Sequence, residues 1–204
     1  MNAIYLAAGK SSRMREHKLS MSLGDTTIGN KALSILLQSD LINYVFVVVN
    51  DKDTLKWISG ENKYLLTGIK GQIIVCANAH KGLSSSLKEG FSFALTKPED
   101  KILVCLADQP YINEEMINSL YQVKMDAKDE FVASSNRGEM KPPILFRREA
   151  YHKVLMLEGD TGARKLIKNG ALQGKKIEFS EDKWFVDIDT KEEYFYLKRE
   201  EELF

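Results

Sequence analysis

Apolar runs rich in β-branched residues recur along this chain, and stretches with helical spacing lie between them. The runs are AIYLA, YVFVVVN, QIIVCA, KILVCLA and EFVASS, at 3–7, 44–50, 72–77, 101–107 and 130–135. In the intervening stretches, 27–39, 51–60, 84–95 and 113–124, apolar residues fall near every third or fourth position. Strands that alternate with helices predict a mostly parallel, twisted sheet with helices on both faces. We therefore expect an α/β fold with three layers, α/β/α.

The second half of the chain is less regular, and two patterns mark helix starts. Ser86 with Glu89, and Thr190 with Glu193, fit the capping box, in which a hydroxyl and a carboxylate satisfy backbone donors. After 130–135 we expect a loop, PPILF, a helix over 148–157, the segment GDTGARKLIKNG, two short strands ending at WFVDID, and a charged terminal helix. No repeat or linker divides the sequence, so we expect one domain over residues 1–204.

Charge and composition narrow the class of protein. Lys+Arg and Asp+Glu both number 29, so no basic excess indicates nucleic acid or an anionic membrane as a partner. No apolar run approaches the ~20 residues that span a bilayer, and the first residues lack a signal-peptide pattern, which predicts a cytoplasmic protein. Cys76 and Cys105 lie in apolar runs and are expected in the core. The three histidines, His17, His80 and His152, do not indicate a zinc site.

Small and basic residues follow the first apolar run. Ala7, Ala8 and Gly9 come directly after it, and the next nine positions hold Lys10, Arg13, Arg15 and Lys18. Ligands bind at the carboxyl ends of strands in open α/β sheets, and small residues let a ligand approach the backbone while Lys and Arg bind phosphate oxygens. This segment therefore suits a nucleoside triphosphate, although a tight turn before a solvated basic stretch gives the same pattern. Neither G-x-x-x-x-G-K-[ST] nor G-x-G-x-x-G is present, which disfavours an ordinary P-loop or dinucleotide fold.

Two acidic motifs follow later apolar runs. Asp108 in LADQP comes after 101–107, and Asp187 and Asp189 lie in FVDIDT. Mg²⁺ takes carboxylate oxygens and keeps substrate phosphates in its other positions, so these motifs predict a magnesium site. Asp108 with Asp187 is the favoured pair of ligands. Alternatively, Asp108 caps a turn, and Asp189 caps the last helix.

A serine-rich segment, NAHKGLSSSLKEG, follows the third run. Backbone N–H groups and hydroxyls of this segment, which includes Asn78 and Gly82, could bind a base or a phosphate. Ser84 is a conceivable nucleophile, but the G-x-S-x-G pattern is broken by Ser86 and the histidines show no triad spacing. The hydrolase interpretation is therefore disfavoured.

Taken together, these motifs resemble the MobA-like nucleotidyltransferases, most closely their molybdenum cofactor cytidylyltransferase branch. LAAGKSSRM with Lys18 is similar to the family's nucleotide-binding signature, and Ala8 leans toward its cytidine-specific branch. GLSSSLKEG resembles the segment around the base, LADQP the metal-binding motif, GDTGAR the acceptor-side loop and DIDTKEE the closing motif. The resemblance implies a Rossmann-like nucleotidyltransferase fold and transfer of CMP from CTP to a phosphorylated acceptor, with pyrophosphate released.

The resemblance also implies roles for particular residues. Arg13, Lys18 and Asp108 would be catalytic, and Asp108 and Asp187 would hold Mg²⁺. The expected nucleotide-binding residues are Leu6, Ala7, Ala8, Gly9, Lys10, Arg13, Lys18, Asn78, Gly82, Ser85 and Ser86. The expected acceptor-binding residues are Asp160, Gly162 and Arg164; Asp160 and Arg164 are alternatively a helix cap and a structural ion-pair partner. The implied substrates are CTP and a molybdopterin-type cofactor, and the implied protein partner is a molybdoenzyme of the xanthine dehydrogenase type.

Two other functions fit the same motifs. One is a cytidylyl- or uridylyltransferase that acts on a sugar or polyol phosphate. The other is a non-catalytic factor that binds a nucleotide-bearing cofactor and delivers it to a molybdoenzyme. The second needs no pair of metal-binding carboxylates, so LADQP and DID together favour an enzyme.

Overall fold

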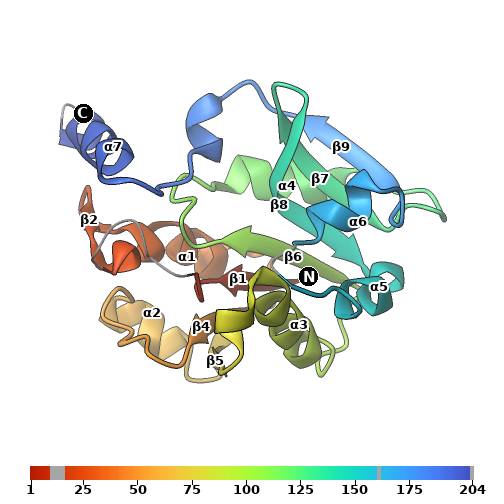
Figure 1. Cartoon of the computed structure of the whole chain (residues 1–204), viewed down its shortest axis with the longest axis horizontal. Helices are drawn as coiled ribbons and strands as arrows, with labels where there is room; N and C mark the ends of the chain where they lie inside the picture. Colours follow the sequence, from red (N-terminus) through yellow and green to blue (C-terminus); the bar gives the residue numbers. More distant parts are fainter. Residues whose placement is uncertain (10–16, 160–161, 203–204) are drawn as a thin grey trace.

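A computed structural model describes residues 1–9, 17–159 and 162–202 of the chain, and its centre is a seven-stranded sheet (Figure 1). The strands lie in the order β5-β4-β1-β6-β8-β7-β9. Their bounds are β1 Asn2–Leu6, β4 Tyr44–Asn50, β5 Gly71–Cys76, β6 Lys101–Leu106, β7 Phe131–Asn136, β8 Glu139–Arg147 and β9 Gly174–Glu178. Every neighbouring pair is parallel except the two pairs that include β8. The expected mostly parallel sheet is confirmed.

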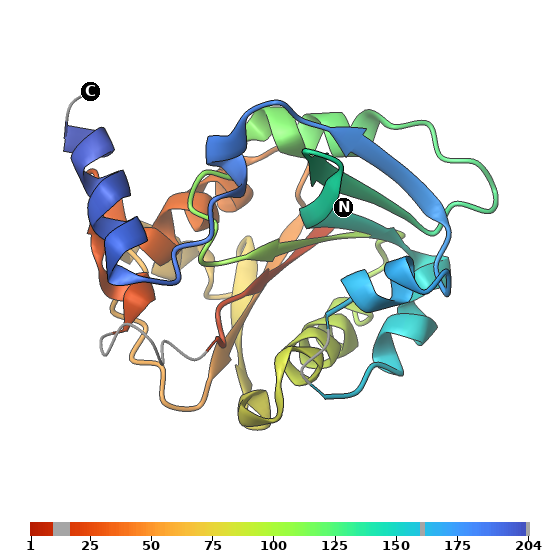
Figure 2. The same cartoon turned by 45° about the horizontal axis from the view of Figure 1, so that its top comes forward.

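Helices cover both faces of this sheet, as Figure 2 shows. The α-helices are α1 Ile28–Gln38, α2 Gly60–Leu65, α3 Leu83–Ala94, α4 Glu114–Gln122, α5 Tyr151–Leu155, α6 Arg164–Lys168 and α7 Lys191–Glu202. Short 3₁₀ helices occupy η1 Lys18–Ser20, η2 Ala79–Lys81, η3 Arg148–Ala150 and η4 Asp182–Phe185, and β2 Ser22–Leu23 pairs with β3 Thr26–Thr27. Side chains of β1 alternate between two cores: Tyr5 packs with α1 and α4, and Ile4 packs with α3 and α5. The expected three layers are therefore present.

The order of the strands creates one topological switch point, beside β1. From β1 the chain moves outward to β4 and then β5, and it returns past β1 to place β6 on the other side. Sheet bonding continues beyond the strand ends, since the Ala7 N–H donates to the Val48 carbonyl at 2.8 Å and the Ala107 N–H to the Leu6 carbonyl at 3.0 Å. In open α/β sheets the crevice at such a point is where ligands bind.

The helix expected over 51–60 is wrong. The Asp53 carboxylate accepts the Leu55 N–H at 2.7 Å, and Leu55 takes a left-handed φ of 56°. A side chain that binds its own backbone two residues on competes with helical bonding, which is why Asp favours turns. The helix begins only at Gly60, where the Ser59 hydroxyl accepts the Asn62 N–H at 3.2 Å.

The two predicted capping boxes have different outcomes. The Glu193 N–H donates to the Thr190 hydroxyl at 3.2 Å and the Thr190 N–H to the Glu193 carboxylate at 2.8 Å, so the box that opens α7 is confirmed. The box at Ser86 is wrong, because α3 already begins at Leu83 after Gly82, whose φ is 118°. Ser86 lies inside this helix, so its hydroxyl does not cap the start.

Two further segments differ from expectation. The loop expected after EFVASS is a tight hairpin between β7 and β8, with positive φ at Arg137 and Gly138, a pairing typical of two-residue hairpin turns. The strand expected to end at WFVDID is instead η4 followed by extended chain. The Ile188 N–H there donates to the Asp108 carbonyl at 3.1 Å, and this bond helps to dock the DID motif against the end of β6.

Other expectations hold in the described residues. Cys76 and Cys105 are free and buried in the cores, as predicted. Within residues 1–9, 17–159 and 162–202, no helix is long and apolar enough to cross a bilayer.

Candidate active site

A pocket of about 510 Å³ opens at the switch point between β1 and β6. Its walls are the end of β1 (Leu6, Ala7, Ala8, Gly9), the end of β6 (Leu106, Ala107, Asp108), η1 (Lys18, Leu19), η2 (Ala79, His80, Lys81) and the start of α3 (Gly82, Leu83, Ser86). The volume is in the range of small-molecule and cofactor sites. Three motifs that lie far apart in the sequence thus meet in one cavity.

Small residues leave the floor of this pocket open. Ala7 and Ala8 are buried, whereas Gly9 is exposed, and a Cβ added to Gly9 would meet no atom of the described residues within 4 Å, its chain neighbours aside. Packing among the described residues therefore does not require glycine here. A ligand that approaches the backbone closely would require glycine at this position, and this is the role that the sequence predicts for Gly9.

Lys18 joins the two acidic motifs across the pocket. Its Nζ lies 2.7 Å from Oδ2 of Asp108 and 3.0 Å from Oδ1 of Asp189, and 7% of the residue is exposed. Burial by itself would lower the pKa of Lys18, but the charges and hydrogen bonds of Asp108 and Asp189 raise it above the usual value. Lys18 therefore stays an ammonium ion at neutral pH and presents a fixed positive charge to the cavity.

Asp187 lies on the wall of a second pocket, next to the first. Although the residue as a whole is exposed, protein packed around its carboxylate displaces water and, with the negative charge of Asp108, raises its pKa to about 6. A hydrogen bond from the buried side chain of Gln109 opposes this effect. The carboxylates of Asp108, Asp187 and Asp189 thus influence one another, and Lys18 is the cation between two of them.

The donor set of this acidic group suits a divalent cation only in part. Among the residues that the structure describes, no three Asp, Glu, His or Cys side chains converge to form a complete metal site. Two carboxylates are nevertheless what Mg²⁺ takes from proteins when triphosphate oxygens and water supply its other ligands. Burial first, and then the negative charges of Asp108 and Asp189, raise the pKa of Asp187, and a bound cation would favour its ionised form. Asp108 and Asp187 therefore fit a metal ion that binds together with a nucleotide.

The second pocket, of about 230 Å³, brings together acceptor-side candidates. Gly162 and Arg164 line it, with Gln109, Lys141 and Asp187. A Cβ at Gly162 would lie 2.9 Å from Cδ2 of Leu83, so glycine lets this loop approach α3 closely. Leu6, Leu83 and Leu106 line both pockets, which makes the pockets neighbours.

Some predicted residues lie elsewhere. Asn78 is exposed before η2, and Ser85 is half-buried on α3; neither lines the first pocket. Successive residues of a helix are about 100° apart, so Ser86 faces the cavity and its neighbour Ser85 does not. The buried Ser84 hydroxyl donates to the Gly159 carbonyl at 2.6 Å, a structural bond that fits the rejection of a serine nucleophile. Lys10, Arg13, Arg15 and Asp160 lie outside the described residues.

Sequence reasoning missed several residues that line the two pockets, and four of them carry a polar group or border a motif that it singled out. His80, Lys81 and Leu83 stand in the first, and Lys141 stands in the second. The first three lie between Asn78 and Ser85. The serine-rich motif therefore identified the correct loop, but not all of the residues in it that line the pocket. Lys141 has no local signal, because the β7–β8 hairpin alone brings it to the second pocket.

A family model described as the MobA-like NTP transferase domain matches residues 3–176. The chain belongs to this family. Purine catabolism protein PucB of Bacillus subtilis (strain 168) is 34% identical over 197 residues, which cover 96% of this chain and 95% of PucB. As a MobA-like chain, the protein has the fold and the family signature of nucleotidyltransferases, which confirms the family resemblance found in the sequence.

Solved structures share the fold of this chain. The homologue of Mycobacterium tuberculosis Rv0371c from Mycobacterium sp. strain JC1 superposes with a TM-score of 0.79 at 23% identity, over 99% of this chain and 96% of that one. Mycobacterium tuberculosis Rv0371c in complex with manganese superposes with a TM-score of 0.69 at 17% identity, over 97% of both chains. At these identities the likeness shows the fold, and the manganese is a property of that structure.

The raised pKa of Asp187 predicts how cation binding depends on pH. Because the folded chain holds this proton up to about pH 6, whereas an ordinary Asp loses it near pH 3.9, the group lowers the free energy of unfolding as the pH rises through that window. Mg²⁺ should remove this penalty once Asp187 is ionised. We expect the Mg²⁺-induced rise in Tm to be large at pH 7.5 and much smaller at pH 5.

The matched variant is Asp187→Asn, in which this pH dependence should vanish while the fold is kept. Calorimetric unfolding with and without Mg²⁺ at each pH measures it. Equal Mg²⁺ stabilisation of both proteins at pH 7.5 would show that Asp187 does not hold the metal.

Proposed function

We propose that this chain transfers CMP from CTP to a phosphorylated acceptor, a molybdopterin-type cofactor, and releases pyrophosphate. The observation that carries the proposal is the 2.7 Å contact between Lys18 and Asp108, which puts the basic and acidic motifs in one pocket with Gly9. A terminal phosphate oxygen of the acceptor would attack the α-phosphorus of CTP, and the bond from that phosphorus to the pyrophosphate oxygen would break.

The chain's own residues would hold and neutralise anions. Two anions that meet at 4 Å repel by about 4 kcal/mol per pair of unit charges at an effective dielectric constant of about 20. Lys18, with Arg13 from outside the described residues, would bind the triphosphate, and Ala7, Ala8 and Gly9 would let it lie along the backbone. Asp108 and Asp187 would hold Mg²⁺, which when bound supplies positive charge to the phosphate oxygens.

No general base is needed for this reaction. A phosphate monoester has a second pKa near ~6, so the attacking oxygen is already ionised at neutral pH. The work that remains is alignment and charge neutralisation, which Lys18 and the cation that the acidic motifs would hold can perform. His80 lines the pocket, but the proposed reaction requires no proton transfer by His80.

The second pocket would receive the acceptor. Its apolar wall includes Leu87, Val104 and Phe146, and Lys141 and Arg164 add positive charge. A flat ring system that carries a phosphate matches such a lining. The likeness to PucB, a purine catabolism protein, supports a recipient molybdoenzyme of the xanthine dehydrogenase type.

Thermal unfolding with each nucleoside triphosphate and Mg²⁺ tests the nucleotide. A ligand at 100 times its Kd stabilises by ~2.7 kcal/mol, which for a chain of this size corresponds to a rise in Tm of about 5–10 °C. We expect CTP with Mg²⁺ to give this shift, and GTP, ATP and UTP to give much less. An equal or larger shift with GTP would overturn the choice of CTP.

Product analysis tests the acceptor and the reaction. The chain is incubated with CTP, Mg²⁺ and either molybdopterin or a set of sugar and polyol phosphates, and pyrophosphate is measured. We expect pyrophosphate and a CMP adduct with molybdopterin alone. Turnover with a sugar phosphate would show that the acceptor is a sugar phosphate and not molybdopterin. CTP binding without pyrophosphate release would identify a carrier protein.

A further inference from the structure

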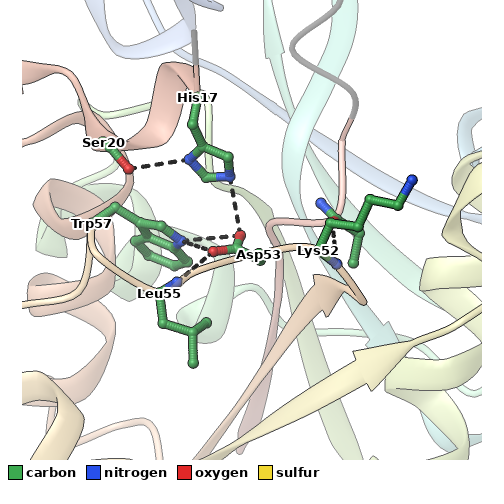
Figure 3. Close-up of polar contacts among 7 residues, drawn as sticks. His17, Ser20, Lys52, Asp53, Leu55 and Trp57 are labelled. Atoms are coloured by element: carbon green, nitrogen blue, oxygen red, sulfur yellow. Dashed lines mark hydrogen bonds and ion pairs between the residues drawn. The ribbon is translucent and has the colours of Figure 1, made fainter.

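Outside both pockets, a buried carboxylate lies in the turn after β4 (Figure 3). The Asp53 side chain is 0% exposed. Its Oδ1 accepts the Leu55 N–H at 2.7 Å and the Trp57 indole N–H at 3.1 Å, and its Oδ2 lies 3.2 Å from Nε2 of His17. A carboxylate so deeply buried is tolerated only when its oxygens are paired. Here the third partner comes from a different part of the chain.

The core fixes the position of Asp53. Trp57, which donates to it, is 1% exposed, and its ring lies 6.3 Å from that of Tyr5 on β1. The Thr27 hydroxyl donates to the Trp57 carbonyl at 2.6 Å, and a Cβ at Gly29 would meet the indole at 2.6 Å. This close packing leaves the indole little room to move. Asp53 is therefore a rigid acceptor tied to β1 and α1.

His17 connects this rigid acceptor to η1. Nε2 of the imidazole contacts the Asp53 carboxylate, and Nδ1 contacts the Ser20 hydroxyl (Figure 3). The distance between Nδ1 and the hydroxyl oxygen is 3.2 Å. The His17 carbonyl accepts the Ser20 N–H at 2.8 Å, so His17 holds both ends of the three-residue helix that carries Lys18. That last bond is the i→i+3 bond of the 3₁₀ helix itself, whose hydrogen-bond geometry is poorer than that of an α-helix. The side-chain contacts of His17 with Asp53 and Ser20 add an anchor outside the helix backbone.

Given the proposed function, we propose that Asp53 is a positioning residue, which acts through His17 to hold η1 so that the Lys18 ammonium stays between Asp108 and Asp189. The Asp53 side chain is fully buried and lines neither pocket, so it does not touch a substrate itself. The Lys18 ammonium lies at the end of a flexible four-carbon chain, so the position of the Lys18 backbone determines where the ammonium can reach. A displacement of about 1 Å can cost about a hundredfold in rate.

Substitutions at His17 test this connection with matched geometry. In Gln, the amide nitrogen can reach the place of Nε2 and donate to Asp53; in Asn, it reaches only the place of Nδ1. We expect His17→Gln to behave as the wild type and His17→Asn and His17→Ala to lose about a hundredfold in kcat, with a smaller change in KM for CTP. Asp53→Asn should share this loss, and the His17→Ala/Asp53→Asn pair should be no worse than either single variant.

A second measurement follows Lys18 without any turnover. Acetic anhydride at low concentration labels lysines, and mass spectrometry gives the rate at Lys18 in the full chain. Since Lys18 is 7% exposed and ion-paired, it should label slowly in the wild type and in His17→Gln, and several-fold faster in His17→Ala, His17→Asn and Asp53→Asn. Val154→Ala, a buried change on α5, controls for loss of stability alone and should leave Lys18 slow.

The two measurements separate the two proposals. If the wild type does not use CTP but the labelling follows this order, the proposed function fails and the positioning role stands. If Lys18 labels as slowly in His17→Ala as in the wild type, or as fast in His17→Gln as in His17→Ala, the positioning role is overturned. Because His17 is about one-third exposed, its variants should fold even if Asp53→Asn does not.

Discussion

Replacing Asp108 by Asn is expected to lower kcat/KM for Mg²⁺-dependent transfer from CTP about a thousandfold. Asparagine keeps the shape but removes the charge that holds the cation, and metal stabilisation of phosphoryl charge is worth several kcal/mol, with 1.36 kcal/mol per factor of ten. The fold should remain intact because the docking bond from Ile188 goes to the Asp108 backbone carbonyl. Pyrophosphate release at saturating and limiting Mg²⁺ measures the loss.

The same strand offers a matched control. Asp100 precedes β6 at its other end, and its side chain is 85% exposed, so Asp100→Asn removes a carboxylate without touching the pocket. We expect wild-type turnover from this variant. Unchanged turnover in Asp108→Asn as well would take Asp108 out of the mechanism, and an equal loss in both would indicate a nonspecific effect of net charge.

The sheet is predictable from the sequence because its central strands are apolar on both faces. YVFVVVN and KILVCLA are buried between two helical layers, so each is a continuous β-branched run rather than an alternating one. The second half of the chain lacks that signal. The hairpin of β7 with β8 depends on left-handed φ at Arg137, a residue type that rarely predicts such a turn.

The candidate site is predictable as a set of strand ends, but its contacts are not. Sequence order placed Ala7, Gly9 and Asp108 at neighbouring strand ends, and one pocket contains all three. The sequence favours Asp187 over Asp189 as a metal ligand, and that choice stays a prediction; the contact that the sequence does not predict is the one between Asp189 and Lys18, at 3.0 Å across a separation of 171 residues. Successive residues of an extended chain face opposite sides, so residues 187 and 189 point to the same side, and the sequence alone does not say which of them contacts Lys18.

The helix wrongly expected over 51–60 shows what periodicity alone leaves out. Its apolar spacing is helical, but Asp53 pairs with Leu55, Trp57 and His17 instead. The bond to Leu55 is local and could be suspected from the turn preference of Asp. The contact with His17 joins the segments that follow the neighbouring strands β1 and β4, and only the assembled sheet places the two residues together.

Replacing Lys18 by Met is expected to separate nucleotide binding from metal binding. Met keeps the apolar stem but removes the ammonium, so kcat/KM with CTP should fall by about 10²–10³, the cost of losing one preorganised donor. Asp108 and Asp189 then face each other without their shared cation, and the free energy of unfolding should fall. Unlike Asp108→Asn, this variant should bind Mg²⁺ at least as tightly as the wild type when no nucleotide is present.

The reason is competition for one oxygen atom. The Lys18 ammonium occupies Oδ2 of Asp108 at 2.7 Å, so a cation that binds this carboxylate must displace it or share it. In Lys18→Met that competitor is absent, and Mg²⁺ should restore much of the lost stability; in Lys18→Met/Asp108→Asn it should restore little. Calorimetric titration with Mg²⁺ alone measures the Mg²⁺ affinity of the wild type, Lys18→Met and Lys18→Met/Asp108→Asn. Weaker Mg²⁺ binding by Lys18→Met than by the wild type would mean that Lys18 supports the metal site rather than competes with it, and that Asp108 binds the cation through a different oxygen.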